Sequence, residues 1–87
     1  MESELFFEIM TGTPMYEDEG HLTEDISVLS RFDKVDLELV GESDYRYKCK
    51  AGNVQQGIDE EDLVHLRNRG WTIEKINGED FFIKSII

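Results

Sequence analysis

The segment from Val35 to Lys50, VDLELVGESDYRYKCK, constrains the fold more than any other, because apolar and charged residues alternate on both sides of a short polar stretch. Side chains of a strand point alternately to its two faces, so a one-residue slip in a hairpin moves every apolar side chain to the wrong face. If Leu39 lies opposite Tyr45, the apolar residues share one face. These residues are Val35, Leu37, Leu39, Tyr45, Tyr47 and Cys49. We therefore predict a β-hairpin in this register.

The other face of this hairpin carries charge pairs that support the same register. Asp36 then lies opposite Lys48, and Glu38 lies opposite Arg46. Each such pair contributes roughly 0.2–1 kcal/mol. Residues 41–43 remain as a three-residue connection, a common hairpin length that favours a residue able to adopt positive φ. Because its basic residues are neutralised by acids, we predict that the hairpin is scaffold.

A second hairpin is predicted at the end of the chain, where Asn77-Gly78 separates two apolar strands. This dipeptide is the strongest short-range turn signal in sequences, and its two-residue loop sets Ile73 opposite Phe82. The other face carries the apolar residues Ile76, Phe81, Ile83 and Ile87. With both faces apolar, this hairpin is expected either to lie between two layers or to be covered by another chain.

Residues 59–69 carry the clearest helix signals. Asp59 is a good N-cap, and Ile58 and Leu63 occupy the two positions of a hydrophobic staple. Gly70 is placed to end the helix in the left-handed conformation. We expect Trp71, the next residue, to enter the core. Arg67 and Arg69 in the last turn are interpreted as cations that favour the negative end of the helix dipole, although arginine and tryptophan are also enriched at interface hot spots.

Residues 22–32 fit two periods. Leu22, Ile26, Leu29 and Phe32 recur at helical spacing, with Thr23 as a possible N-cap. A strand is the alternative, because some of the same residues also share strand parity. Leu29 fits the helical period alone, so we favour a short helix.

The remaining segments complete the expected order of elements. Alternating apolar residues predict a first strand near residues 4–10, and the aperiodic stretch Thr11–Gly20, with two glycines and a proline, predicts a long loop. Residues 51–57 are polar and are expected to form a connection with a short extended piece at Val54. We therefore predict an α+β fold in one domain, 1–87. It would consist of a mainly antiparallel sheet of two hairpins and an N-terminal strand, packed by one or two helices.

Charge limits the classes of partner. The formal net charge is −11, and residues 1–30 contain eight acidic residues and no lysine or arginine. Such an excess repels phosphate backbones and anionic membranes, so it favours a basic partner protein over nucleic acid or lipid. The chain shows neither a signal peptide nor a membrane span, and its single cysteine excludes an internal disulfide, so a cytoplasmic location is expected.

Motifs that carry catalytic or cofactor chemistry are not recognisable in the sequence. The acids around His21 match no calcium loop, and we interpret them as a solvated flank rather than a metal site. His65 is expected to pair with Glu61 one helical turn earlier, and Cys49 is expected to be a buried small hydrophobe. The sequence therefore predicts no enzyme, no metal and no cofactor.

The leading functional hypothesis is a non-enzymatic acidic protein-interaction module. Its predicted partner-binding residues are Glu17, Asp18, Glu19, Glu24 and Asp25. In the sharper form it is an inhibitor that presents carboxylates to the nucleic-acid-binding surface of its partner, and its composition, though no specific motif, looks like that of small acidic inhibitors encoded by phages. The alternative is a homodimer or assembly component that buries Ile76, Phe81 and Ile83. A metal-dependent or small-molecule-binding protein is the third hypothesis.

Overall fold

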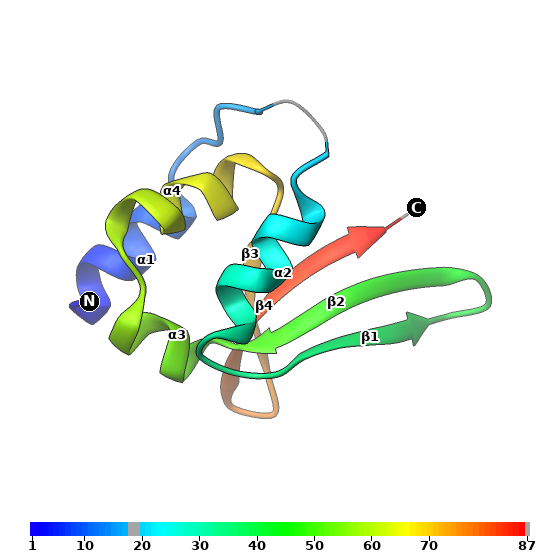
Figure 1. Ribbon diagram of the computed structural model, residues 1–87. Coiled ribbons are helices and arrows are strands. Elements are labelled where there is room, and N and C mark those ends of the chain that lie inside the picture. Colours follow the sequence, from blue (N-terminus) through cyan, green and yellow to red (C-terminus); the bar gives the residue numbers. More distant parts are fainter. Residues whose placement is uncertain (18–19, 87) are drawn as a thin grey trace.

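Four strands form one antiparallel sheet in the order β1-β2-β4-β3 in the computed structural model, which describes residues 1–17 and 20–86 (Figure 1). The strands are β1 (Val35–Val40), β2 (Asp44–Lys50), β3 (Thr72–Ile76) and β4 (Glu79–Ile86). The helices are α1 (Ser3–Thr11), α2 (Leu22–Ser30), α3 (Ala51–Gly57) and α4 (Glu60–Asn68). The predicted α+β class is confirmed. Among the described residues, no helix has the length and apolar character needed to cross a membrane.

Both predicted hairpin registers are confirmed. In the first hairpin Leu39 pairs with Tyr45 and the remaining partners follow as predicted. In the second hairpin Ile73 pairs with Phe82. Its turn is the two-residue Asn77-Gly78 loop, with φ of 52° and 81° at the two positions, which an asparagine and a glycine adopt more readily than other residues.

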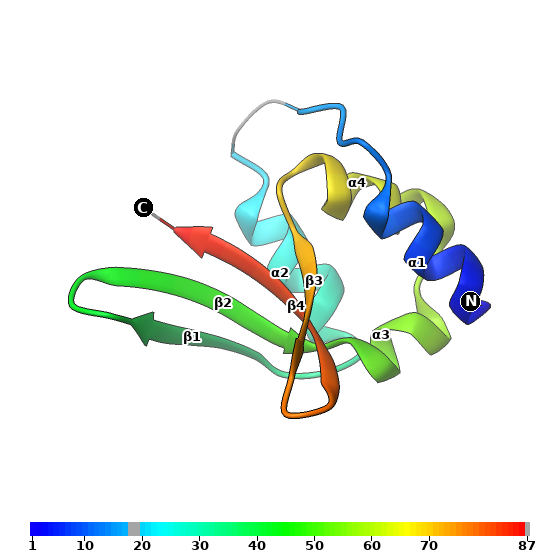
Figure 2. The same cartoon turned by 180° about the vertical axis from the view of Figure 1, so that it is seen from behind.

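The helices gather around one end of the sheet, and the β1–β2 hairpin extends beyond them in both views (Figures 1 and 2). The apolar face of this hairpin is therefore covered only at its inner end. Cys49 there is buried, whereas Leu37 and Leu39 farther out are 56% and 52% exposed. The alternation of residues correctly predicted which side chains share the apolar face of the hairpin. It could not predict how much of that face the helices cover.

Cys49 is a core residue, as predicted. Its side chain is buried at the inner end of β2, where β2 pairs with Phe82 of β4. Burial raises the pKa of the Cys49 thiol to about 12, and the negative charges of Asp33 and Asp36 add to the effect. The thiol therefore stays protonated at neutral pH and is a poor nucleophile.

The predicted N-terminal strand near residues 4–10 is wrong, because this segment is the helix α1. Its buried side chains are Phe6, Ile9 and Met10, which follow the helical spacing of three and four residues. The ring of Phe6 packs edge-on against Phe82 of β4, with 5.7 Å between the ring centroids. The apolar run LFFEIM fits both periods, and contact with the sheet selects the helical one.

The predicted connection at residues 51–57 is also wrong, because it is the short helix α3. Ala51 and Val54, three residues apart, are both buried in the core. The end of α3 lies close to the ring of Phe32: a β carbon added at Gly57 would lie 2.5 Å from its Cε1 atom. Close packing against Phe32 thus explains the glycine at position 57. The sequence did not predict this helix because its residues are mostly polar and only two of its side chains are buried.

The predicted helix over residues 22–32 is confirmed as α2, although it begins at Leu22 and its N-cap is His21 rather than Thr23. The predicted loop Thr11–Gly20 is confirmed over residues 12–17 and at Gly20, whereas Thr11 is the last residue of α1. The buried apolar residue of α2 is Leu29, the residue that separated the helical period from the strand period. This helix places Asp25 beside it in the core.

The strong signals at residues 59–70 are confirmed by α4. Ile58 and Leu63 are buried, as a hydrophobic staple requires, although the side chain of Asp59 makes no capping hydrogen bond. Gly70 has a φ of 91° and donates its amide to Arg67 O at 3.2 Å. The Trp71 amide donates to Leu66 O at 3.0 Å, which completes a Schellman motif and turns the tryptophan into the core.

The described part of the second face of the β3–β4 hairpin is covered within the chain, and Ile87 lies outside the described residues. Phe81 and Ile83 are buried, and Ile76 is half-buried. Lys48, which pairs with Ile83 across the sheet, lies with its Nζ atom 5.2 Å from the centroid of the Phe81 ring. The homodimer through these three apolar residues stays a prediction, but two of them already have intrachain cover.

Candidate functional site

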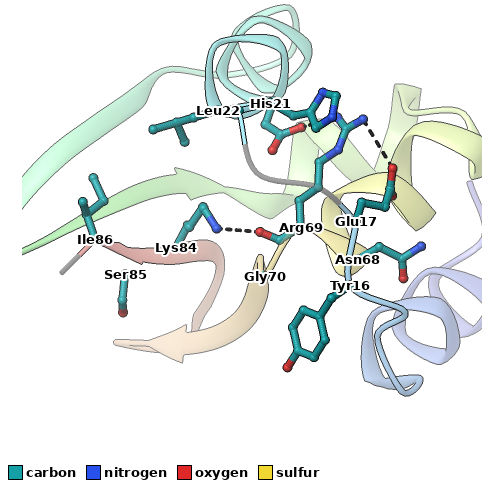
Figure 3. Close-up of a pocket in the computed structure, with 12 residues that line it drawn as sticks. Tyr16, Glu17, His21, Leu22, Asn68, Arg69, Gly70, Lys84, Ser85 and Ile86 are labelled. Carbon is teal, nitrogen blue, oxygen red and sulfur yellow. Dashed lines mark hydrogen bonds and ion pairs between the residues drawn. The ribbon is translucent and has the colours of Figure 1, made fainter.

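Arg69, the residue that closes α4, lies at the centre of a charge cluster (Figure 3). Its Nη1 atom lies 2.7 Å from Asp25 Oδ1 and 3.8 Å from Glu24 Oε2, and its Nη2 atom lies 3.6 Å from Glu17 Oε1. The Arg69 side chain is only 14% exposed. Three of the predicted partner-binding acids are therefore brought together, but they converge on a cation of the same chain.

Asp25 is a core residue rather than a surface acid. It is 2% exposed, and its second carboxylate oxygen accepts a hydrogen bond from Trp71 Nε1 at 3.1 Å. Buried carboxylates are retained when they are paired and hydrogen-bonded, and this one has both kinds of partner. In this position Asp25 supports the fold and presents no exposed carboxylate to a partner.

The other predicted site residues differ in their surroundings. Glu17 contacts His65, with 2.8 Å between Glu17 Oε2 and His65 Nδ1, whereas the sequence interpretation paired His65 with Glu61. Glu24 is 67% exposed and lies 3.2 Å from His21. The remaining two predicted acids, Asp18 and Glu19, lie outside the described residues.

The contact with His65 makes Glu17 sensitive to acid. The hydrogen bond from His65 holds the pKa of the Glu17 carboxyl below its ordinary value, and the charges of His65 and Arg69 act in the same direction. The folded state therefore gains stability from this carboxylate above its ordinary pKa and loses it as the pH falls through the lowered value.

We expect the attachment of the loop at Glu17 to weaken as the pH falls through the lowered pKa of this carboxyl. The Glu17 backbone amide donates to Asn68 O at 3.3 Å. The measurement is the exchange rate of this amide relative to an unstructured peptide at the same pH, followed by NMR as the pH is lowered. Glu17→Gln should remove the transition. An equal acid transition in that variant would show that another group controls the loop.

A surface cavity of about 650 Å³ opens beside the Arg69 cluster (Figure 3). It is bordered by the loop before α2, the first residues of α2, the end of α4 and the end of β4. Two cations line it, but Arg69 is held by carboxylates and Lys84 Nζ donates to the Arg69 carbonyl. In this cavity, both described cations thus already have partners within the chain.

A different set of acids is exposed on α1 and at the start of α4. The two helices pack together. The Met1 ammonium donates to Gln55 O in α3, the helix that precedes α4, and Arg67 Nη1 near the end of α4 donates to Ile9 O near the end of α1, so α1 and α4 run in the same direction. Their exposed acids, called here the α1–α4 acidic surface, are Glu2, Glu4, Glu8, Asp59, Glu60 and Glu61. Within the described part of the chain, none of them forms an ion pair.

Sequence reasoning missed this surface because it read residues 4–10 as a strand. With a helical period, Glu4 and Glu8 lie one turn apart on the side opposite Phe6, and that spacing was the available signal. The exposed acids in the first turn of α4, Glu60 and Glu61, also stabilise the helix locally, because they lie at the positive end of its dipole.

The arrangement offers recognition through exposed carboxylates, which bind ammonium and guanidinium groups. Over residues 1–17 and 20–86, no cluster of three or more histidine, cysteine, aspartate or glutamate side chains has an arrangement that could hold a metal ion. No family model, no curated protein and no solved structure matches this chain, so its function is inferred from its own residues and geometry.

Proposed function

We propose that this chain is a non-enzymatic acidic protein-interaction module of the cytoplasm that binds a basic surface of a partner protein. The observation that supports the proposal is the α1–α4 acidic surface. Most lysines and arginines are already engaged by carboxylates of the same chain. Those in ion pairs are Arg31, Lys34, Arg46, Lys48, Lys50 and Arg69. The acids of α1 and of the start of α4 therefore contribute negative charge to the surface that lysines and arginines of the described residues do not neutralise.

The partner surface that suits this array is one that binds nucleic acid. Such surfaces neutralise phosphates with lysine and arginine, and much of their affinity comes from this charge. Carboxylates on two packed helices are held at fixed separations, and residues one turn apart, such as Glu4 and Glu8, have their β carbons about 5–6 Å apart. The chain would then act as an inhibitor of the phage-encoded kind, occupying a groove that otherwise holds phosphates.

The test compares two variants that lose the same charge from different places. Glu4→Gln with Glu8→Gln removes two carboxylates from the α1–α4 acidic surface. Glu42→Gln with Asp44→Asn removes two from the tip of the β1–β2 hairpin, where both side chains are exposed. Each protein is used to capture partners from a host lysate at low and high salt, and the captured proteins are purified for affinity measurements.

We expect the helix variant to bind a captured partner about tenfold more weakly and the hairpin variant to bind normally, because exposed charges steer association through local complementarity. Binding should weaken with salt, and duplex DNA or RNA should compete for the same partner. Equal binding by the two variants would refute the assigned surface. A partner that binds in a salt-dependent way without any competition by nucleic acid would refute the mimicry.

A further inference from the structure

Met15 and Tyr16, in the loop between α1 and α2, are unusually exposed for large apolar residues. Their side chains are 76% and 83% exposed, more than any other large apolar side chain in the described residues. The ring of Tyr16 projects away from Glu17 and Arg69 (Figure 3). Two consecutive exposed side chains of this size gain little from the hydrophobic effect in the free chain.

The backbone on both sides of Tyr16 is nevertheless held by one residue of α4. The Met15 amide donates to Asn68 Oδ1 at 2.9 Å, and the Glu17 amide donates to Asn68 O at 3.3 Å. Arg67 fixes the orientation of the Asn68 side chain, since its Nε and Nη2 atoms donate to the same Oδ1 at 3.2 and 3.1 Å. The backbone on each side of Tyr16 is therefore hydrogen-bonded to Asn68, and Arg67 fixes the orientation of the Asn68 side chain.

The side chain of Glu17 adds a further attachment through His65 and Arg69. Fixing the backbone costs about 1–2 kcal/mol per residue, and at Met15 and Tyr16 no buried side chain offsets that cost. The contacts instead hold the backbone that carries two solvent-exposed apolar side chains. Pre-organisation of this kind lowers the entropy lost on binding, and tyrosine is among the residues enriched at binding hot spots.

We propose that Met15 and Tyr16 form a pre-organised contact element that inserts into an apolar pocket of a partner protein, and that this pocket has a basic rim. The basic rim is argued from charge. Beside the loop, the carboxylates of Glu17, Glu24 and Asp25 surround the single guanidinium of Arg69, which leaves an excess of negative charge. The inference goes beyond the proposed function, because the α1–α4 acidic surface and nucleic-acid mimicry play no part in it.

The first experiment uses the free chain. Hydrogen exchange followed by NMR should show the Met15 and Glu17 amides to be protected. The Glu17 amide donates to the Asn68 carbonyl, which any substitution keeps, but the Met15 amide donates to Asn68 Oδ1, so Asn68→Ala should remove the Met15 protection. Tyr16→Ala should retain it, because that side chain makes no contribution to the attachment. Exchange of both amides at the rate of an unstructured peptide in the unsubstituted chain would overturn the pre-organisation.

The second experiment measures the affinity of each purified partner that the chain captures from lysate. Tyr16→Ala should weaken binding at least about tenfold, and Asn68→Ala should weaken it in the same direction with the contact side chains intact. Tyr45→Ala is the matched control, since this tyrosine is 47% exposed on the distant β1–β2 hairpin and should bind normally. Circular dichroism and thermal unfolding establish that the variants are folded.

Three results would overturn the proposal. One is normal binding by Tyr16→Ala, and another is an equal loss in the Tyr45→Ala control. The third is that Tyr16 controls only self-association in light scattering. Loss of binding by the α1 double variant with retention in Tyr16→Ala would support the acidic module and refute this contact element, so the two proposals fail separately.

Discussion

Asp25→Ala is expected to lower the free energy of unfolding by about 3 kcal/mol, the largest effect of any acid among the described residues. Removing one member of a buried ion pair typically costs about 3–5 kcal/mol, because the remaining charge loses its partner. Here Glu17 and Glu24 still lie near Arg69, which argues for the lower end of that range. The indole N–H of Trp71 also loses its acceptor while buried.

Urea denaturation of matched variants measures this effect. Asp25→Asn keeps an acceptor for Trp71 but loses the charge opposite Arg69, so an intermediate loss is expected. Glu24→Gln is the control, because this acid is 67% exposed and 3.8 Å from Arg69, and it should change stability by less than about 0.5 kcal/mol. If the free energy of unfolding of Asp25→Ala were within about 1 kcal/mol of that of the parent, Asp25 and Arg69 would not act as a buried ion pair.

The role of Asp25 also changes how partner binding should be tested. Reversing the charge of every predicted partner-binding acid would place a cation at this buried position beside Arg69. Loss of binding would then report unfolding rather than a lost contact. Variants confined to exposed acids, such as Glu4 and Glu8, separate the two effects.

The parts of the fold that could be predicted are those with local causes. The β1–β2 register follows from alternation over a few residues, and the β3–β4 turn follows from the conformations open to Asn77 and Gly78. The end of α4 follows likewise from the freedom of Gly70 to adopt positive φ. In each case the deciding residues lie within a few positions of one another.

The Arg69 cluster could not be predicted, because its members are far apart along the chain. The hydrogen bonds of Asp25 reach Arg69 and Trp71, 44 and 46 positions later. Glu17, Glu24 and Asp25 looked uncompensated because their shared cation, Arg69, comes from the end of α4. Charge counts along a sequence cannot show which acids are neutralised by distant residues. For this reason the sequence predicted the acidic surface at the loop before α2, whereas in its described residues the structure has exposed acids without ion pairs on α1 and at the start of α4.

Phe6→Ala is the second large expected effect, a loss of about 3–5 kcal/mol in the free energy of unfolding. The Phe6 side chain is fully buried and packs edge-on against both Phe7 and Phe82. The surrounding core side chains can collapse only partly into the space, so a cavity adds to the lost burial. Urea denaturation measures the loss, and fluorescence of Trp71 reports the transition.

Leu5→Ala is the matched control on the same helix, and it also decides between the two periods that the run LFFEIM allows. A helix leaves Leu5 37% exposed, so its truncation should cost less than about 1 kcal/mol. A strand would place Leu5 with Ile9 on the buried face and turn Phe6 outward, because side chains alternate along a strand. The strand therefore predicts the reverse order of losses. A larger loss for Leu5→Ala than for Phe6→Ala would contradict α1, and with it the spacing that places Glu4 and Glu8 together on its exposed side.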